Sequence, residues 1–321
     1  MTMVTDSAAR PLIGAHCGGG IRAAFANAID IGAECLQVFV AAPQMWRAPK
    51  FSDADVEAFI EAQRTSGLGP VFIHAIYLLN LGSSNPVFIE KSIQSLRDHL
   101  MWANRLGVDG VIFHPGSAGT EPYGLAEDRA VAALQLILDG YDGKARLLLE
   151  TCAGQGATIG RSFEELASLM RRMDDDPRLG VCLDTCHVFA AGYPLHEPDG
   201  PGRILADFDS IIGVNRLACI HVNDSKGAFS SNVDRHENIG AGRLGDATFA
   251  RLMEIPEIRN IPLILEVPGL EGEGPDRANM DILKLLRRDG LAAVRPTLEF
   301  ADPPPKPATR KRKSQVQEIA P

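Results

Sequence analysis

The sequence lacks a long apolar run, a dense set of cysteines and an excess of positive charge. No apolar run in the 321 residues approaches the roughly 18 residues that a membrane-spanning helix needs. The first ten residues also lack the apolar centre of a signal peptide. Six cysteines are scattered along the chain, unlike the closely spaced cysteines of small secreted domains. We therefore expect a cytoplasmic protein with reduced thiols and no membrane partner.

The overall charge also limits the kind of partner. The formal net charge is −9, with 45% hydrophobic and 23% charged residues. This composition is typical of a water-soluble globular domain with a sizeable core. A negative protein does not hold nucleic acid by bulk charge, so any contact with nucleic acid needs a local positive field.

Eight short, β-rich apolar segments recur along the chain, separated by 24 to 45 residues from one end to the next. They are Leu12–His16, Cys35–Val40, Val71–His74, Gly110–His114, Arg146–Glu150, Val181–Asp184, Ala218–His221 and Pro262–Glu266. Segments with helical periodicity lie in most of the intervals: Asp53–Gln63, Ile89–Leu106, Asp128–Leu138, Phe163–Arg172 and Ala247–Met253. Ser52 and Ser162 are predicted N-caps, with Glu165 completing a capping box at Ser162 and Asp55 a weaker one at Ser52.

This alternation predicts an α/β fold with a parallel sheet that is buried on both faces. Eight units favour a closed (β/α)₈ TIM barrel over an open doubly wound sheet, which is the alternative. We place the barrel at residues 11–300, after a flexible N-terminus at residues 1–10. Residues 301–321 are rich in proline and carry a basic run, Arg310–Lys313, so they are predicted to form a disordered basic tail.

Six of the eight apolar segments end in a side chain that can bind a metal ion or a proton. These residues are His74, His114, Glu150, Asp184, His221 and Glu266. A single histidine after a strand is usually an ordinary hydrogen-bonded residue. Closure of a barrel, however, brings the carboxyl ends of all eight strands onto one rim, so the six side chains should converge on one pocket.

Two local motifs extend this set. His187 follows Asp184 by three residues, in the expected loop after a strand end. Asp234 and His236 are two residues apart, so in extended backbone both side chains point the same way and could hold one ion.

The nine residues together comprise five histidines and four carboxylates, with no Lys or Arg at any strand end. Four converging carboxylates without a counter-charge would repel one another, so cations must neutralise them. Mixed nitrogen and oxygen ligands suit Zn²⁺ best, with Mn²⁺ or Fe²⁺ as alternatives. Nine ligands suit two or three ions, and three divalent ions would leave a positive pocket of phosphate size. Metal-bound water ionises near neutral pH, and neighbouring ions can stabilise the attacking and leaving oxygens of a displacement.

Three other features receive no catalytic role. The G-x-G-x-x-G pattern at Gly240–Gly245 follows no predicted strand, so a dinucleotide site is rejected. His16 either supports the site from outside or is packed in the core. Cys186 is interpreted as a structural thiol.

The motifs that carry these residues resemble those of the endonuclease IV family of apurinic/apyrimidinic endonucleases, within the xylose isomerase-like barrels. The resemblance extends from about Ile13 to Leu286 and includes Gly14–His16, Tyr77–Gly82, Phe113–Ser117, Leu149–Thr151, Ala153–Gly156, Asp184–His187, Ala190–Tyr193, His221–Asp224, Val233–His236 and Leu265–Glu266. It implies three zinc ions. His74, His114 and Glu150 would bind the first. Glu150 would bridge to a second, which Asp184, His221 and Glu266 complete, and His187, Asp234 and His236 would bind the third.

The resemblance also implies a function: a monomeric DNA-repair phosphodiesterase that cleaves double-stranded DNA on the 5′ side of an abasic site, leaves a 3′-hydroxyl and removes blocked 3′ ends. Glu150 and Glu266 would be catalytic, and Tyr77 would face the extruded nucleotide. Family members can carry a basic, DNA-inserting residue around Pro43–Trp46, where this chain has Gln44 or Met45. Tyr77 and Gln44 are the residues that we expect to contact DNA. A metal-dependent sugar isomerase or epimerase on the same barrel is the main alternative. A metal-stabilised DNA-binding protein without turnover is the third.

Overall fold

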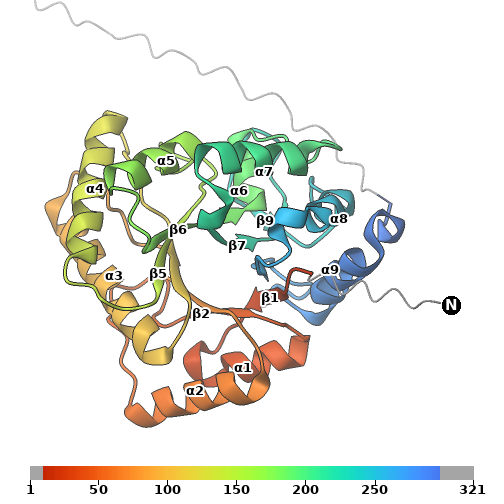
Figure 1. Cartoon of the computed structure of the whole chain (residues 1–321), viewed down its shortest axis with the longest axis horizontal. Coiled ribbons are helices and arrows are strands. Elements are labelled where there is room, and N and C mark those ends of the chain that lie inside the picture. Colours follow the sequence, from red (N-terminus) through yellow and green to blue (C-terminus); the bar gives the residue numbers. More distant parts are fainter. Residues whose placement is uncertain (1–9, 297–321) are drawn as a thin grey trace, which may run out of the picture.

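The computed structural model describes residues 10–296 and shows a closed barrel of eight parallel strands inside a ring of helices (Figure 1). The strands follow one another around the barrel in chain order, and the last one pairs with the first. They are β1 (Ile13–His16), β2 (Leu36–Phe39), β3 (Val71–His74), β4 (Gly110–Phe113), β5 (Arg146–Glu150), β6 (Leu179–Asp184), β7 (Leu217–His221) and β10 (Leu263–Leu265). The predicted TIM barrel is confirmed.

The helices cover the outer face of the barrel and bury their apolar sides against the strands. They are α1 (Gly20–Ile31), α2 (Asp53–Ser66), α3 (Pro86–Leu106), α4 (Tyr123–Leu138), α5 (Phe163–Arg172), α6 (Thr185–Ala191), α7 (Gly200–Ile211), α8 (Asp246–Glu254) and α9 (Arg277–Asp289). Short 3₁₀ turns occur at Val214–Arg216, Pro256–Ile258 and Gly290–Ala293. A separate two-stranded antiparallel pair, β8 (Asp224–Ser225) and β9 (His236–Glu237), lies outside the barrel sheet.

Both predicted helix caps form, but the complete capping box is at Ser52 and not at Ser162. The complete capping box is at Ser52, whose side chain accepts from the Asp55 amide while Asp55 accepts from the Ser52 amide. Ser162 also accepts from the Glu165 amide, yet the Glu165 carboxylate turns back to the amides of Gly160 and Arg161. The reciprocal bond predicted at Ser162 is therefore wrong, because two amides of the preceding loop compete for that carboxylate.

The inside of the barrel is filled by a compact apolar cluster of its own. One residue from, or next to, each of seven strands contributes: Cys35, Phe72, Ile112, Leu148, Cys182, Cys219 and Ile264. Since side chains alternate along a strand, the residue two positions further on faces the same interior. That position holds His74, Glu150 and Asp184 on β3, β5 and β6. The alternation that packs the barrel thus also aims these side chains at the end of the interior where the strands finish.

Some predicted boundaries and segments lie outside what the structure tests. The predicted flexible N-terminus, apart from Arg10, and the predicted tail at residues 301–321 lie outside the described residues, as do residues 297–300 of the predicted barrel domain. All six cysteines lie within the described part and are free and buried. No helix of residues 10–296 is both long enough and apolar enough to cross a membrane.

Candidate metal centre

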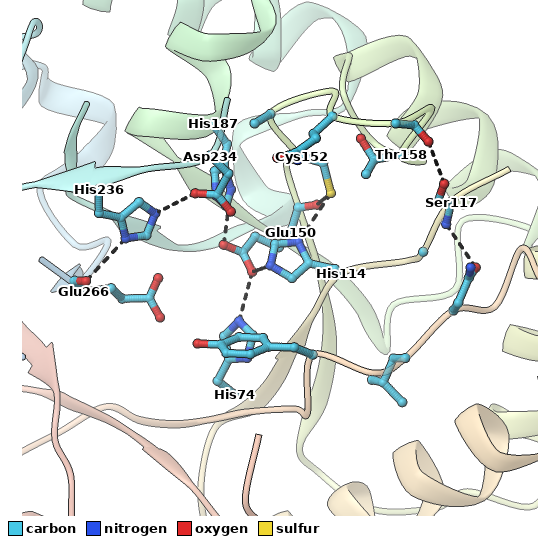
Figure 2. Close-up of a pocket in the computed structure, with 17 residues that line it drawn as sticks. His74, His114, Ser117, Glu150, Cys152, Thr158, His187, Asp234, His236 and Glu266 are labelled. Carbon is cyan, nitrogen blue, oxygen red and sulfur yellow. Dashed lines mark hydrogen bonds and ion pairs between the residues drawn. The ribbon is translucent and has the colours of Figure 1, made fainter. Parts of the chain in front are cut away.

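The nine side chains that the sequence singled out meet at the carboxyl-terminal end of the barrel. Seven of them line a pocket of about 610 Å³, shown in Figure 2: His74, His114, Glu150, His187, Asp234, His236 and Glu266. The other two, Asp184 and His221, are completely buried and do not line the pocket. They belong to the same cluster, since each lies within 3.7 Å of another of the nine residues. No Lys or Arg belongs to the described residues that line this pocket.

Within this set, the atoms that could bind a metal form three groups, of which the first two share Glu150. In each group all of the candidate ligand atoms lie within 4.8 Å of one another. The groups are His74, His114 and Glu150; then Glu150, Asp184, His221 and Glu266; and then His187, Asp234 and His236. A further combination joins Cys186 to Asp184 and His236. The first three groups coincide with the three ligand sets that the sequence motifs implied.

Glu150 connects the first two groups because its two carboxylate oxygens face different partners. Its Oε2 lies 3.0 Å from His74 Nε2 and 3.3 Å from His114 Nε2. Its Oε1 lies 3.0 Å from His221 Nδ1. The side chain is completely buried at the end of β5. A carboxylate in this arrangement can bridge two cations.

Asp184 and His187 owe their positions to the start of α6. Asp184 is the last residue of β6 and the N-cap of α6, and its Oδ1 accepts a hydrogen bond from the His187 amide at 2.9 Å. His187 therefore lies in the first turn of a helix, and the loop predicted for it is wrong. The helix carries His187 Nε2 to within 3.1 Å of Asp234 Oδ1.

Asp234 and His236 are placed by the small β8–β9 pair, in which Ser225 lies opposite His236. His236 Nε2 is 3.4 Å from Asp234 Oδ1 and 3.6 Å from Asp184 Oδ2. The two side chains of this i, i+2 pair therefore do point to the same place. The third group is built from helix α6, which supplies His187, and from the segment that leads into β9, which supplies Asp234 and His236.

The glycine-rich pattern after β9 binds an anion that belongs to the protein itself. The amides of Gly240, Gly242 and Gly245 all donate to Oδ2 of the buried Asp224 carboxylate, and two further amides donate to its Oδ1. A Cβ at Gly242 would lie 2.3 Å from Asp224 Oδ1, so glycine is required there. No strand is predicted from the sequence before this pattern, whereas the two-residue strand β9 precedes it in the structure. The amides that would bind a dinucleotide phosphate are occupied by Asp224.

Replacing Asp224 with asparagine should therefore destabilise the fold. Burial raises the pKa of Asp224 to about 6, so the group is charged at pH 8. An amide NH₂ in place of either oxygen would face two or three backbone donors and leave them unsatisfied. We expect a loss of about 3 kcal/mol in the free energy of unfolding, measured in urea at pH 8. Asp98→Asn, on the exposed face of α3, is the control, and equal stability of the two variants would contradict this role for Asp224.

The hydrogen bonds of the histidines test whether this centre suits metal ions. In His74 and His187, the ring nitrogen Nδ1 is hydrogen-bonded to a backbone carbonyl. His74 Nδ1 lies 2.7 Å from the Ala75 carbonyl oxygen, and His187 Nδ1 lies 2.8 Å from the Thr151 carbonyl oxygen. A carbonyl can only accept, so these nitrogens carry the proton and their Nε2 atoms face the cluster with a lone pair when neutral. Nε2 of His187 and of His236 are buried and make no hydrogen bond of standard geometry, although Asp234 Oδ1 lies 3.1 and 3.4 Å away. Buried nitrogens in this state fit metal ligation.

Protons compete with metal ions for the same side chains. Burial lowers the pKa of His187 and His221, but the surrounding carboxylates outweigh it and raise both pKa values well above 6.5. Burial raises the pKa of Glu150, whereas the charges and hydrogen bonds of the histidines outweigh that and hold it well below 4.5. The pKa values of Asp234 and Glu266 are lowered in the same way. Without metal, imidazolium groups neutralise the carboxylates.

This arrangement predicts the pH dependence of the metal-free protein. The raised pKa values of His187 and His221 contribute stability below pH 6.5 that is lost as pH rises through their folded pKa values. The lowered pKa values of the carboxylates contribute stability that is lost only in strong acid. Chelator-treated protein should therefore be most stable from about pH 5 to pH 7 and become less stable towards pH 10. Thermal unfolding across this range measures it, and stability that rises steadily to pH 10 would contradict it.

Several supporting residues were not found in the sequence analysis. Gln37 on β2 is completely buried and bonds to His221 and Glu266. Asn223 donates to Asp184 Oδ2 at 2.7 Å and accepts from the Glu266 amide at 2.8 Å. Thr151 accepts from the Asp184 amide. A signal was present for Gln37, since it is the one polar residue in the apolar segment Cys35–Val40.

The two residues predicted to contact DNA occupy different positions. Tyr77 lines the pocket, is 54% exposed, and its ring meets those of Phe39 and His74 edge-on. Gln44 is exposed in the turn after β2 and is not among the residues that line the pocket. The structure joins this turn to Tyr77, because the Tyr77 amide donates to the Pro43 carbonyl at 2.8 Å.

Known proteins with a similar sequence or structure include members of the family that the sequence motifs resemble. Residues 25–288 match the family model described as "Xylose isomerase-like TIM barrel". A "Probable endonuclease 4" from Trichlorobacter lovleyi is 37% identical over 277 residues, which cover 85% of this chain and 99% of the relative. The solved endonuclease IV from Thermus thermophilus is 37% identical, with a TM-score of 0.76 over 87% of this chain and 99% of that one. A D-tagatose 3-epimerase-like protein, 17% identical with a TM-score of 0.65 over 86% of this chain and 96% of that one, shares the fold alone.

Proposed function

This chain belongs to the family of xylose isomerase-like TIM barrels that includes the endonuclease 4 proteins, and from that premise we propose that it is a metal-dependent DNA-repair endonuclease. Its substrate would be double-stranded DNA with an abasic site. It would hydrolyse the phosphodiester on the 5′ side of the lesion, leave a 3′-hydroxyl, and remove blocking groups from 3′ ends. It would act as a monomer.

One observation carries the proposal: five histidines and four carboxylates converge at one end of the barrel in three groups, two of which share Glu150. A sugar isomerase has no evident use for the third group, His187, Asp234 and His236. The isomerase alternative also rests on distant fold relatives, such as one that is 17% identical, whereas the endonuclease 4 protein from Trichlorobacter lovleyi is 37% identical.

The proposed centre would hold three Zn²⁺ ions. His74, His114 and Glu150 would hold the first, Glu150, Asp184, His221 and Glu266 the second, and His187, Asp234 and His236 the third. When bound, the ions supply a nucleophile near neutral pH and stabilise developing charge on the phosphate oxygens. Glu150 and Glu266 act by holding their charges fixed at the pocket floor, since their lowered pKa values keep both ionised at neutral pH.

The pocket and its rim agree with a substrate that has lost a base. Glycosylase-type and endonuclease-type sites reach a lesion by turning the nucleotide out of the duplex, which costs least where no base is stacked. Tyr77 stands half exposed beside His74, where it can cover the extruded sugar with its ring. Its phenol stays neutral, because burial and the nearby carboxylates raise its pKa.

A duplex that carries one abasic site opposite a normal base tests this function. The zinc-loaded protein should cut the damaged strand once, directly 5′ of the site, and the upstream product should be extended by a DNA polymerase because it ends in a 3′-hydroxyl. An undamaged duplex of the same sequence is the control. Zinc-loaded, folded protein that leaves the abasic duplex intact while epimerising a ketose at C3 would overturn the proposal.

A further inference from the structure

Gln37 brings an uncharged amide to the strand-end layer of the barrel interior, among the candidate ligands and His16. It lies on β2, two residues after the core residue Cys35, and its side chain therefore points into the barrel. It is completely buried. A buried amide must satisfy its hydrogen bonds inside the protein, so the atoms around it report which way it is turned.

Its partners determine the orientation of the amide. One end lies 2.6 Å from Glu266 Oε1, and an ionised carboxylate can only accept, so this end is the NH₂ group. The second hydrogen of the same nitrogen is directed to His16 Nδ1 at 3.1 Å. Burial lowers the pKa of His16 to about 4, so its ring is neutral and can accept. The carbonyl end, Oε1, is left facing His221 Nε2 at 2.8 Å.

This orientation determines the tautomer of His221. Because Oε1 can only accept, His221 Nε2 must carry a hydrogen. The lone pair of the neutral ring is then on Nδ1, which lies 3.0 Å from Glu150 Oε1 and 3.1 Å from Glu266 Oε2. His221 differs in this from His74 and His187, whose inward nitrogens are Nε2.

We propose that Gln37 is a positioning residue for the candidate centre: its amide fixes His221 as an Nδ1 ligand and holds Glu266 in place, without itself binding metal. The inference rests on the proposed function only in taking the second group as a metal site. One glutamine sets the direction of two ligands from different strands, β7 and the end of β10. Groups that orient metal ligands in this way typically change metal affinity or activity by 10- to 100-fold when removed.

Gln37→Met tests the proposal, because methionine has a similar volume and makes none of the three hydrogen bonds. The affinity of the full chain for Zn²⁺, measured by competition with a chromogenic chelator, should fall 10- to 100-fold at the tightest step. Gln94→Met, on the exposed side of α3, is the matched control and should bind zinc like the native chain. Zinc affinity within twofold of native in folded Gln37→Met would overturn the proposal.

A second measurement needs no variant at position 37. In the zinc-loaded native protein, labelled with ¹⁵N-histidine, the His221 ring should show a proton on Nε2 and none on Nδ1, with the signal assigned by its loss in His221→Gln. A proton on Nδ1 would overturn the inference. The two proposals fail on different results. The endonuclease proposal fails if the native chain binds zinc with this His221 tautomer but does not cut abasic DNA.

Discussion

Replacing Glu150 with glutamine should reduce the rate of abasic-site incision by about a thousandfold or more. Glu150 is the one side chain shared by two of the three groups, with each oxygen near a different set of histidines. The amide keeps the shape but loses the charge, and its NH₂ group has no lone pair with which to bind an ion. Losing several kcal/mol of transition-state stabilisation corresponds to a rate loss of this size. Single-turnover incision with enzyme in excess measures it.

Two controls separate this effect from misfolding. Glu61→Gln removes the same charge on the exposed face of α2 and should cut at the native rate. The thermal unfolding of Glu150→Gln shows whether the barrel is intact. A folded Glu150→Gln protein with near-native turnover and a full complement of metal would refute the bridging role of this residue.

Removing divalent ions should abolish incision and also lower the melting temperature. Chelation leaves four carboxylates and five histidines facing one another with protons alone to neutralise them. Ligands that bind only the folded state stabilise it by mass action, so their removal lowers stability by several kcal/mol. Zn²⁺ added back should restore both activity and melting temperature.

The number of ions distinguishes the two functions that share this barrel. Elemental analysis of the purified chain should give about three divalent ions for the endonuclease, whereas about one would favour the isomerase alternative. Asp234→Ala is the informative variant, because it removes a ligand from the third group alone. It should retain about two ions. A variant that keeps all three would contradict the assignment of Asp234.

The sequence was sufficient for the parts of this structure that depend on periodicity. Apolar segments ending in His74, Glu150 and Asp184 predicted strands whose ends the structure places within a residue or two. Closure of the barrel then brought their side chains together without any knowledge of the loops. Helices α3 and α5 were predicted for the same reason, since each has a well-separated apolar face.

The remaining features depend on contacts between segments that are far apart in the sequence. His187 was placed in a loop because α6 has only seven residues, too few for a helical period to be recognised, although Asp184 is a favourable N-cap residue. The orientation of Glu165 depends on two loop amides, and that of Gln37 on residues in β1, β7 and after β10. The glycine pattern at residues 240–245 has a local signature, but only the fold shows that its anion is Asp224.

The shared interior of the barrel restricts how this protein can change in length. Phe72 and His74, like Leu148 and Glu150, belong to one row on their strand. Inserting or deleting a single residue within a row would turn every later side chain outward, so that a core residue and a candidate ligand would be lost together. Changes of length are therefore tolerable in the connections between strand and helix but not in the strands. The spacing of two residues is as strict a requirement as the chemical identity of the ligand.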